Sequence, residues 1–537
     1  MSGVIVQGLS NSRKTPGVFL SVLLGGSPTS AGAAAKKILL LGNKITSAIT
    51  AASPSFTVAA GTQANAAPVF LASADDAATY FGRGSEIHRM AKRVYAQYPD
   101  ALVYGCASAE SGGSRATGVL TFATTATAAF TVRITIGDFP IDVPVASGDT
   151  PTVIATACAT AILQYPDLPV TAQFSAGVLT TSAKHPGPRG NDLVVRGQFI
   201  NAAGVPTEIT ESSTTSPGAT TGIWSSTATV ESTIHLAGGT TADTVTTALA
   251  ALAATKYDRI VSSYRDATAV DAIAAQVDSM EGVTTQLRQQ FIYGFQGTYG
   301  AAVTLATGRN DSLGQCVWQY NSPTPPEEFA AQVAAARLIG DGIVGGVRFG
   351  ETSRPNANLD GCMLATTLVS PFAGEQPTST EIEGALNNGI TPLAPSSSRD
   401  GYASIVRSIT TRSLDGSGAQ NYSVIDTATP TVCQYVADDL QSDLATVFAG
   451  VNLQSDSSDG SPPEAANTVT PSIVRARIAY KLGLYEEQGI TRDATANMSL
   501  LAVIENPSVA GRLDCEIPVE PASALHIIGG NVRQVGG

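Results

Sequence analysis

Charged side chains are scarce in this chain of 537 residues: only 14% are Asp, Glu, Lys or Arg, whereas 43% are hydrophobic. Such a composition predicts a folded protein, too long for one core, with three or four domains. A surface poor in Lys and Glu lacks the side chains that keep most soluble proteins apart. We therefore expect much of the surface to be interface.

Runs of Lys and Arg are absent, and acidic side chains outnumber basic ones by 44 to 31. Binding to a phosphate backbone or to an anionic membrane requires clustered positive charge, which a formal charge of -13 disfavours. No uninterrupted apolar run reaches the roughly 18 to 20 residues of a membrane-spanning helix. We expect no direct nucleic acid partner and no membrane insertion.

The first eleven residues lack the basic start, apolar run and cleavage site of a secretory signal, which predicts synthesis in the cytoplasm. Cysteines stand singly and form no C-x-x-C motif. This pattern favours buried free thiols, with disulfides or a metal site as the alternatives. The six residues are Cys106, Cys158, Cys316, Cys362, Cys433 and Cys515.

Sequence signatures of catalysis are missing as well. The chain has neither a phosphate-binding G-x-x-x-x-G-K-[ST] motif nor a G-x-S-x-G nucleophile elbow. A G-x-G-x-x-G match at residues 340–345 follows a predicted helix, where it indicates a helix end and a loop rather than a nucleotide site. Four histidines lie far apart, so we expect none of them to catalyse. They are His88, His185, His235 and His526.

Three acidic pairs, at residues 75–76, 327–328 and 438–439, invite interpretation as carboxylate dyads. The first two pairs fall at predicted helix N-termini, where negative charge complements the helix dipole. The third lies on a predicted helix without a partner site. We therefore predict helix electrostatics and no catalytic residue, no cofactor and no metal ligand.

Apolar periodicity predicts a strand, a helix and a strand at residues 36–42, 85–98 and 101–105. The alternation resumes after residue 240. Helices are predicted at 242–254, 267–280 and 326–338, and strands at 259–263, 291–294 and 315–318. Repeated units of this length imply a parallel sheet covered by helices on both faces. We assign residues 31–114 and 233–380 to one discontinuous α/β core.

Residues 115–232 interrupt that alternation with Thr-, Ala- and Val-rich runs broken by Gly, Pro and Asp. The texture predicts mainly antiparallel β structure with one helix at 151–164. We interpret this segment, called the insert below, as a β-rich surface domain. A passive surface role is favoured, and binding to a host receptor or protection of a lattice are the alternatives.

Residues 381–522 have the pattern of a smaller α+β domain. Predicted are a strand at 389–393, a hairpin at 404–411, helices at 431–448 and 471–487, and strands at 500–505 and 512–519. Residues 454–466, rich in Ser, Asp, Gly and Pro, are predicted as an exposed loop. The fold class is therefore α/β plus α+β.

Two short strand-like segments, at residues 16–22 and 524–528, stand at opposite ends of the chain. A lone strand leaves its backbone N–H and C=O groups unpaired and must find a sheet edge in its own chain or in a neighbour's. We predict terminal arms, residues 1–30 and 523–537, that serve assembly rather than catalysis.

The RKTPGVF sequence at residues 13–19 resembles the R-x-P-G-V-Y/F start of contractile-tail sheath proteins of myophages. Residues 388–393, 405–411 and 520–528 are similar to the Mu-type branch of that family, in matching order and spacing. The resemblance covers the chain except for the insert. It implies a virion tail protein, assembled in the host bacterial cytoplasm, whose copies stack as rings in a helical sheath around a tail tube protein.

The resemblance further implies an irreversible contraction, contacts with baseplate and tail terminator proteins, and roles for individual residues. Arm strands that join sheets of neighbouring subunits would include Val18, Phe19, Leu20, Val22, Leu525, His526, Ile527 and Ile528. Hinge candidates beside them are Gly25, Gly26, Gly529 and Gly530. On the helix at 471–487, the cations that could face the tube, or simply be solvated, are Arg475, Arg477 and Lys481. The strands within 500–519 would accept the arms.

Two alternatives stay open at this point. A sheath of a phage-derived contractile injection system, a tailocin, would share fold and mechanics. An α/β hydrolase-like enzyme is a competing class because doubly wound cores host many hydrolases.

Overall fold

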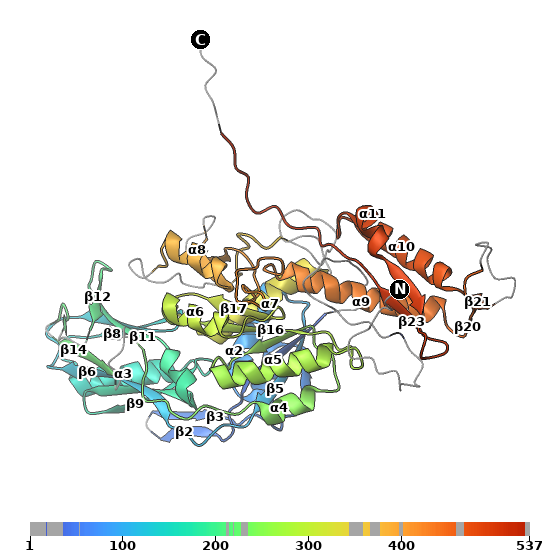
Figure 1. Cartoon of the computed structure of the whole chain (residues 1–537). Helices are drawn as coiled ribbons and strands as arrows, with labels where there is room; N and C mark the ends of the chain where they lie inside the picture. Colours follow the sequence, from blue (N-terminus) through green and yellow to red (C-terminus); the bar gives the residue numbers. More distant parts are fainter. Residues whose placement is uncertain are drawn as a thin grey trace, which may run out of the picture.

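The computed structural model describes residues 18, 36–52, 54–210, 214–218, 220–226, 235–342, 358–365, 376–396, 401–457 and 467–531. Across these residues the chain is a mixed α/β protein with several sheets, as predicted. Figure 1 shows the insert at one end, a large sheet with its helices in the middle, and the C-terminal helices and strands at the other end.

The largest sheet in the described residues, called the main sheet, has eight strands. In spatial order they are β19 (Ala403–Ile405), β18 (Ile390–Pro395), β17 (Gly314–Trp318), β16 (Gln290–Phe295), β15 (Arg259–Ser262), β1 (Lys37–Asn43), β5 (Leu102–Ser108) and β4 (Val69–Leu71). Pairing is parallel from β18 to β5, and the two edge strands are antiparallel to their neighbours. The predicted parallel sheet is therefore confirmed.

Helices cover both faces of the main sheet. Packed on one face are α1 (Ala74–Phe81), α2 (Glu86–Gln97) and α7 (Pro326–Gly342), and on the other α4 (Thr246–Leu252), α5 (Ala267–Glu281), α6 (Tyr299–Thr307) and α8 (Ser379–Asn387). In β1, Ile38 and Leu40 face the first group, whereas Leu39 and Leu41 face the second. A strand buried on both faces is continuously apolar, which explains the KILLLG sequence.

The main sheet extends beyond residue 380, where the sequence predicted the end of the α/β core. Strand β18 pairs in parallel with β17, with Ile390 opposite Cys316, and β19 then adds antiparallel to β18. Without β18, the outer backbone groups of β17 would be buried and unpaired, which is costly. The limit at 380 is therefore corrected, while the other predicted domain limits stay a prediction.

In its described residues the insert has antiparallel sheets and one α-helix, α3 (Pro151–Leu163), close to the predicted helix. One sheet has the order β13 (Thr214–Thr215), β14 (Thr221–Ser226), β6 (Arg115–Ala123), β10 (Val178–Pro186), β9 (Val170–Ser175), and the other β12 (Pro206–Ile209), β11 (Val195–Ile200), β7 (Phe130–Ile136), β8 (Phe139–Val145). A 3-10 turn, η1 (Pro188–Asp192), follows β10. A hairpin of β2 (Ile49–Ala52) and β3 (Ser55–Val58) reaches across, and its Phe56 packs against the apolar core of the insert.

The C-terminal region, residues 428–519, builds a separate apolar cluster. It contains α9 (Ala428–Val447), α10 (Pro471–Glu487), α11 (Ala494–Asn497), η2 (Met498–Leu500), and the strand pairs β20 (Asn452–Leu453) with β21 (Thr468–Val469) and β22 (Ala502–Glu505) with β23 (Leu513–Glu516). Helix α10 has the predicted bounds. Its buried side chains Val474, Ile478 and Leu482 recur at intervals of four residues and belong to the same apolar cluster as residues of α9 and β22.

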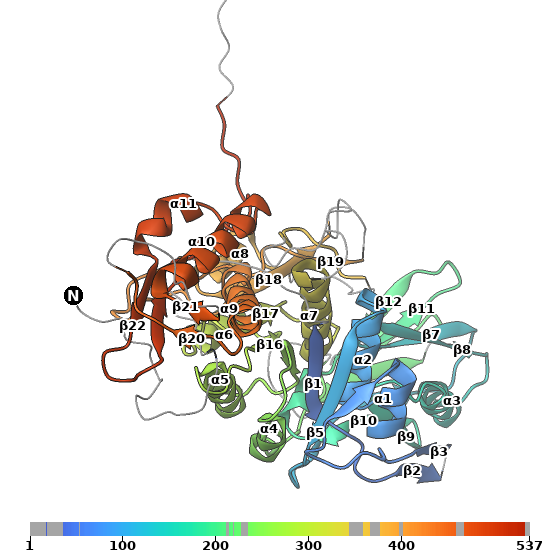
Figure 2. The same cartoon turned by 90° about the vertical axis from the view of Figure 1, so that its right-hand side faces the viewer.

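Helix α9 connects this region to the main sheet through polar contacts. Gln290 of β16 donates to Thr431 at 3.1 Å and to Gln434 at 3.0 Å, and both partners lie on α9. Arg288 pairs with Asp438 at 2.6 Å. Figure 2 shows α9 between the sheet strands β16 and β17 and helix α10. The two parts therefore share a hydrogen-bonded interface rather than a purely apolar one.

Among the described residues, no helix combines the length and the apolar character that crossing a membrane requires. No disulfide joins the six cysteines, all of which the structure describes, and four of them are buried.

Candidate assembly site

The predicted N-terminal arm lies mostly outside the described residues. This holds for Phe19, Leu20, Val22, Gly25 and Gly26. Val18 is described, is partly buried, and packs against the apolar cluster of the C-terminal region. The first residue of the predicted arm strand therefore lies on the same apolar cluster as β22.

The predicted C-terminal arm leaves the body of the protein as an extended segment (Figure 1). Its apolar side chains Leu525, Ile527 and Ile528 are exposed by 70%, 82% and 84%. Residues 522–531 form no strand within the single chain, so the predicted strand at 524–528 stays a prediction about contact with a neighbouring copy. The physical reason is that a strand exists only when a neighbouring strand pairs with it.

Gly529 and Gly530, the predicted hinge residues of this arm, have open space around them: an added Cβ would meet no atom within 4 Å. Packing therefore does not require glycine at either position. A hinge role stays a prediction.

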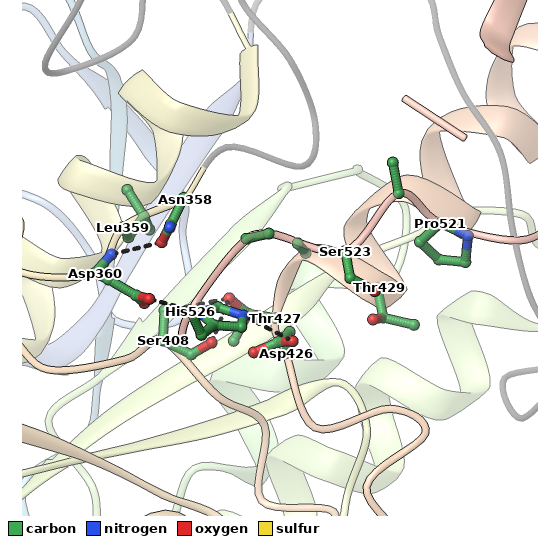
Figure 3. Close-up of a pocket in the computed structure, with 13 residues that line it drawn as sticks. Asn358, Leu359, Asp360, Ser408, Asp426, Thr427, Thr429, Pro521, Ser523 and His526 are labelled. Atoms are coloured by element: carbon green, nitrogen blue, oxygen red, sulfur yellow. Dashed lines mark hydrogen bonds and ion pairs between the residues drawn. The ribbon is translucent and has the colours of Figure 1, made fainter. Parts of the chain in front are cut away.

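His526 differs from its apolar neighbours because it is held at the root of the arm, residues 521–526. Figure 3 shows its ring between Asp360 and Asp426 in a pocket lined by the segment 358–360, the start of α9 and residues 521–524. The Nδ1 atom lies 2.5 Å from Asp360 Oδ2, and Nε2 lies 3.4 Å from Asp426 Oδ2. Arg407 also binds Asp426, with N–O distances of 2.8 Å and 3.0 Å.

Electrostatics at the arm root favour a charged imidazole. The hydrogen bond to Asp426, together with that to Asp360, raises the pKa of His526 above its ordinary value of 6.5, against the opposing effect of burial. Burial alone would raise the pKa of Asp426, but its bonds to His526 and Arg407 lower it overall. Two carboxylates and two cations thus form one compact cluster.

The three predicted tube-facing cations on α10 already have partners within the chain. Arg477 forms a bidentate pair with Asp443 of α9, at 2.8 Å and 2.5 Å, and Lys481 pairs with Asp439 at 2.5 Å. Arg475 donates to the carbonyl oxygens of Leu501 and Met498 at 3.1 Å and 3.0 Å. These contacts hold α10 in place, and tube contact by these residues stays a prediction.

The β22–β23 hairpin has two outer edges on which no other strand of the described chain is paired. Asn506 N–H donates to Arg512 O at 2.9 Å, so this pair closes the hairpin. In an antiparallel ladder, hydrogen-bonded and non-hydrogen-bonded pairs alternate, which directs the N–H groups of Glu505 and Leu513 outward. These edges are suited to accept an added strand.

The carboxyl ends of β1 and β15, where doubly wound sheets bind ligands, are filled by an arginine of the insert. Arg189 donates from Nε to Glu86 Oε1 and from Nη2 to Asp243 Oδ2, both at 2.8 Å. Its guanidinium also stacks on the ring of Tyr264 at 4.2 Å. Asn43, the last residue of β1, donates to Asp243 at 2.7 Å.

The paired charges at this position are stable in their ionised forms. Burial would raise the pKa of Glu86, but the field of Arg189, together with hydrogen bonds from Arg189 and Ser263, lowers it well below its ordinary value. Arg89 of α2 is also buried and pairs with Glu327 at 2.8 Å and with Glu328. A buried cluster of ion pairs occupies the switch point of the sheet.

Two of the three acidic pairs lie at helix N-termini, where the sequence predicted them. Asp75 and Asp76 lie in the first turn of α1, and Glu327 and Glu328 in the first turn of α7. The G-x-G-x-x-G match begins inside α7, and residues 343–345 lie outside the described part. His88 is buried, accepts a bond from Gly84 N–H at 2.9 Å, and burial lowers its pKa to about 4.

The remaining histidines do not converge. His185 contacts Glu110 at 2.6 Å and His235 contacts Asn321 at 2.5 Å. Within the described residues, no group of three or more His, Cys, Asp and Glu side chains could hold a metal ion.

Sequence reasoning missed both charge clusters. The partners Arg189 and Glu86 are 103 residues apart, and His526 and Asp360 are 166 residues apart. No spacing signal connects residues at such separations. One local signal was available: a single arginine within the P-G-P-R-G loop at residues 186–190 is an unusual choice for a passive surface turn.

Comparison with known proteins assigns the chain to a structural context. It is similar to the Mu-like prophage FluMu tail sheath protein of Haemophilus influenzae, with 23% identity over 473 residues, 88% of this chain and 86% of the relative. The chain is related to a Mu-like tail sheath protein. The predicted resemblance is thereby confirmed, and the hydrolase-like alternative is not favoured. No protein-family model matches the chain.

Two solved structures of sheath tail proteins also match this chain over most of its length and of their own. The Listeria innocua protein is 11% identical with a TM-score of 0.46, covering 93% of this chain and 94% of its own. The Desulfitobacterium hafniense protein is 13% identical with a TM-score of 0.42, covering 92% of each chain. These likenesses are too distant to add to the sequence match.

Proposed function

We propose that this protein is the subunit of a contractile tail sheath, which polymerises around a tail tube and contracts to drive the tube through the host envelope. The observation that carries the proposal is the similarity to a tail sheath protein along 88% of the chain. The exposed apolar arm beyond His526 and the open edges of the β22–β23 hairpin support it. In this function the arm of one copy adds a strand to the unpaired edge of the β22–β23 hairpin in another copy.

Strand exchange links the subunits in this mechanism. Residues 18–22 and 525–528 pair as strands with the β22–β23 hairpins of neighbouring copies. Backbone hydrogen bonds tolerate rotation of the attached bodies, so rings can shorten and widen while the links persist. A gain of about 1 kcal/mol per subunit, summed along a cooperative lattice, is enough to make contraction irreversible.

The proposed division of labour follows the chain. Residues 31–114 and 233 onward through β19 form the sheath core, 115–232 an outward domain, the C-terminal region the inner face, and 1–30 and 523–537 the arms. The partners are further copies of this chain, a tail tube protein, and baseplate and tail terminator proteins. The protein is then a component of the virion tail, assembled in the cytoplasm of the host bacterium.

Electron microscopy of the purified protein at rising concentration tests this function. We expect the full chain to form hollow, ridged cylinders and a variant that lacks residues 1–25 to remain a folded monomer with the same circular dichroism. The deletion removes the predicted arm strand and, among the described residues, only Val18, which is partly buried against the C-terminal cluster. With unchanged circular dichroism, loss of polymers would therefore report on the arm. Tubes formed by the truncated chain would refute the N-terminal arm, and compact particles from the full chain would refute the sheath function.

A further inference from the structure

The C-terminal arm contacts its own subunit as far as His526. The amide of Ala522 donates to Ile490 O at 3.0 Å, and Asn358 donates to the carbonyl oxygen of Leu525 at 3.4 Å. His526 is the last side chain with a described partner, since Ile527 and Ile528 beyond it are more than four-fifths exposed. The transition from held to free chain is abrupt.

We propose that His526 anchors the C-terminal arm: clamped between Asp360 and Asp426, it holds the chain on its own subunit through residue 526 and sets the point from which the arm departs to a neighbour. Its departure point matters because an arm can reach a distant sheet edge only from a fixed origin. The destination of the arm rests on the proposed function, whereas the clamp itself does not.

Each carboxylate of the clamp comes from a different part of the fold. Asp360 belongs to the segment that bridges back to β19, where Gly361 N–H donates to Ile405 O at 2.6 Å. Asp426 directly precedes α9 and is fixed by Arg407. His526 therefore fastens the arm to the main sheet and to α9 at once (Figure 3). An apolar residue at 526 could fill the pocket but could not bind both carboxylates.

Protonation controls the strength of this clamp. The charged groups around the ring are Asp360, Asp426 and, behind Asp426, Arg407, on which Glu383 of α8 also acts. Because both contacts raise the pKa of His526, the stabilisation is complete below the ordinary value of 6.5 and is lost as pH rises through the raised pKa. The arm root is held most firmly in mildly acidic solution and loosens in alkaline solution.

Hydrogen exchange of the unassembled full chain tests the clamp directly. We expect His526→Ala and Asp360→Asn to speed exchange of the Ala522 amide, which is protected by its hydrogen bond to Ile490 O, by about tenfold. Ile527→Ala, a matched change one residue further on, should leave it unchanged. In the wild type, exchange corrected for its intrinsic pH dependence should rise as the pH increases above 6.5, through the raised pKa of His526. Unchanged exchange in His526→Ala, or a flat corrected profile in the wild type, would overturn the anchor.

Polymerisation assays distinguish a failure of the His526 clamp from a failure of the proposed sheath function. Removal of residues 527–537 should abolish polymers and leave exchange at 521–526 unchanged; polymers from this truncated chain would refute the arm's destination but not the clamp. His526→Ala, with the arm intact, should need a several-fold higher protein concentration to polymerise. If this variant exchanges faster at the root but polymerises as the wild type does, His526 does not position the arm.

Discussion

At the scale of single residues, Arg189 decides whether the insert and the main sheet are one body. Its side chain is only 8% exposed, and its partners Glu86 and Asp243 are 4% and 0% exposed. Removing one member of a buried ion pair leaves the opposite charge without solvent or partner, which costs far more than the net contribution of the pair. This arginine should be intolerant of neutral replacement.

We expect Arg189→Met to destabilise the protein by about 3–5 kcal/mol, seen as a lower urea concentration at the first unfolding transition. The matched control is Arg133→Met in the same insert, because the Arg133–Asp142 pair is 37% and 50% exposed. Its loss should cost less than about 1 kcal/mol. Equal shifts for the two variants would contradict a buried clamp.

At the scale of elements, the prolines of the edge strands contrast with the β22–β23 hairpin. Strand β8, at one edge of the insert, carries Pro140 and Pro144, both on exposed positions. Proline cannot donate to a ladder, so it blocks the addition of a further strand. Strands β22 and β23 contain no proline. One edge is thus closed to strand addition and the other is open.

A proline introduced into the β22–β23 hairpin should block strand addition there, as the prolines of β8 do at the edge of the insert. We expect Glu505→Pro to leave the hairpin folded, because Glu505 N–H points outward, but to prevent polymerisation if arms add to this edge. Circular dichroism and the thermal midpoint check folding, and electron microscopy checks assembly. The control is Glu505→Ala, which keeps the N–H group. Wild-type polymers from the proline variant would exclude this edge as an acceptor.

Elements with their own local signals were predictable, and those that depend on partners were not. The bounds of α10 follow from Pro471 at its first turn and from apolar residues at helical spacing, and β1 follows from a continuous apolar run.

Helix α6 was missed because its Ala- and Thr-rich sequence has little amphipathic contrast. Strand β18 was predicted but assigned to the C-terminal domain, since the residues that it pairs with on β17 are 74 positions earlier in the chain. The clamp at His526 depends on contacts 100 and 166 residues away.

At the scale of the whole molecule, the insert is part of the body rather than an appended decoration. It leaves and re-enters the main sheet at one point, where Ser114 Oγ donates to Gly238 O at 2.6 Å. Besides Arg189, the insert supplies Asp138, which pairs with Arg93 of α2 at 2.6 Å. The insert is therefore tied to the core by buried ion pairs as well as by the chain connections.

Excision of residues 115–237, with a short glycine linker from Ser114 to Gly238, should lower the thermal midpoint because Glu86 and Asp243 lose their cation. Adding Glu86→Gln and Asp243→Asn to the excised chain should recover part of that loss. Scanning calorimetry of the intact, excised and rescued chains measures both steps. An excised chain as stable as the intact one would identify the insert as a dispensable decoration.

The plugged switch point also bears on how such proteins exchange parts during evolution. A recombination event that replaced the insert with a foreign segment would have to bring a cation to the same place, or the recipient would be left with two stranded carboxylates. A replacement segment would therefore need both a compatible fold and a cation at the position of Arg189. Sequence changes are therefore tolerated more readily in the outer loops of the insert than at its base, which must keep the cation that the core requires.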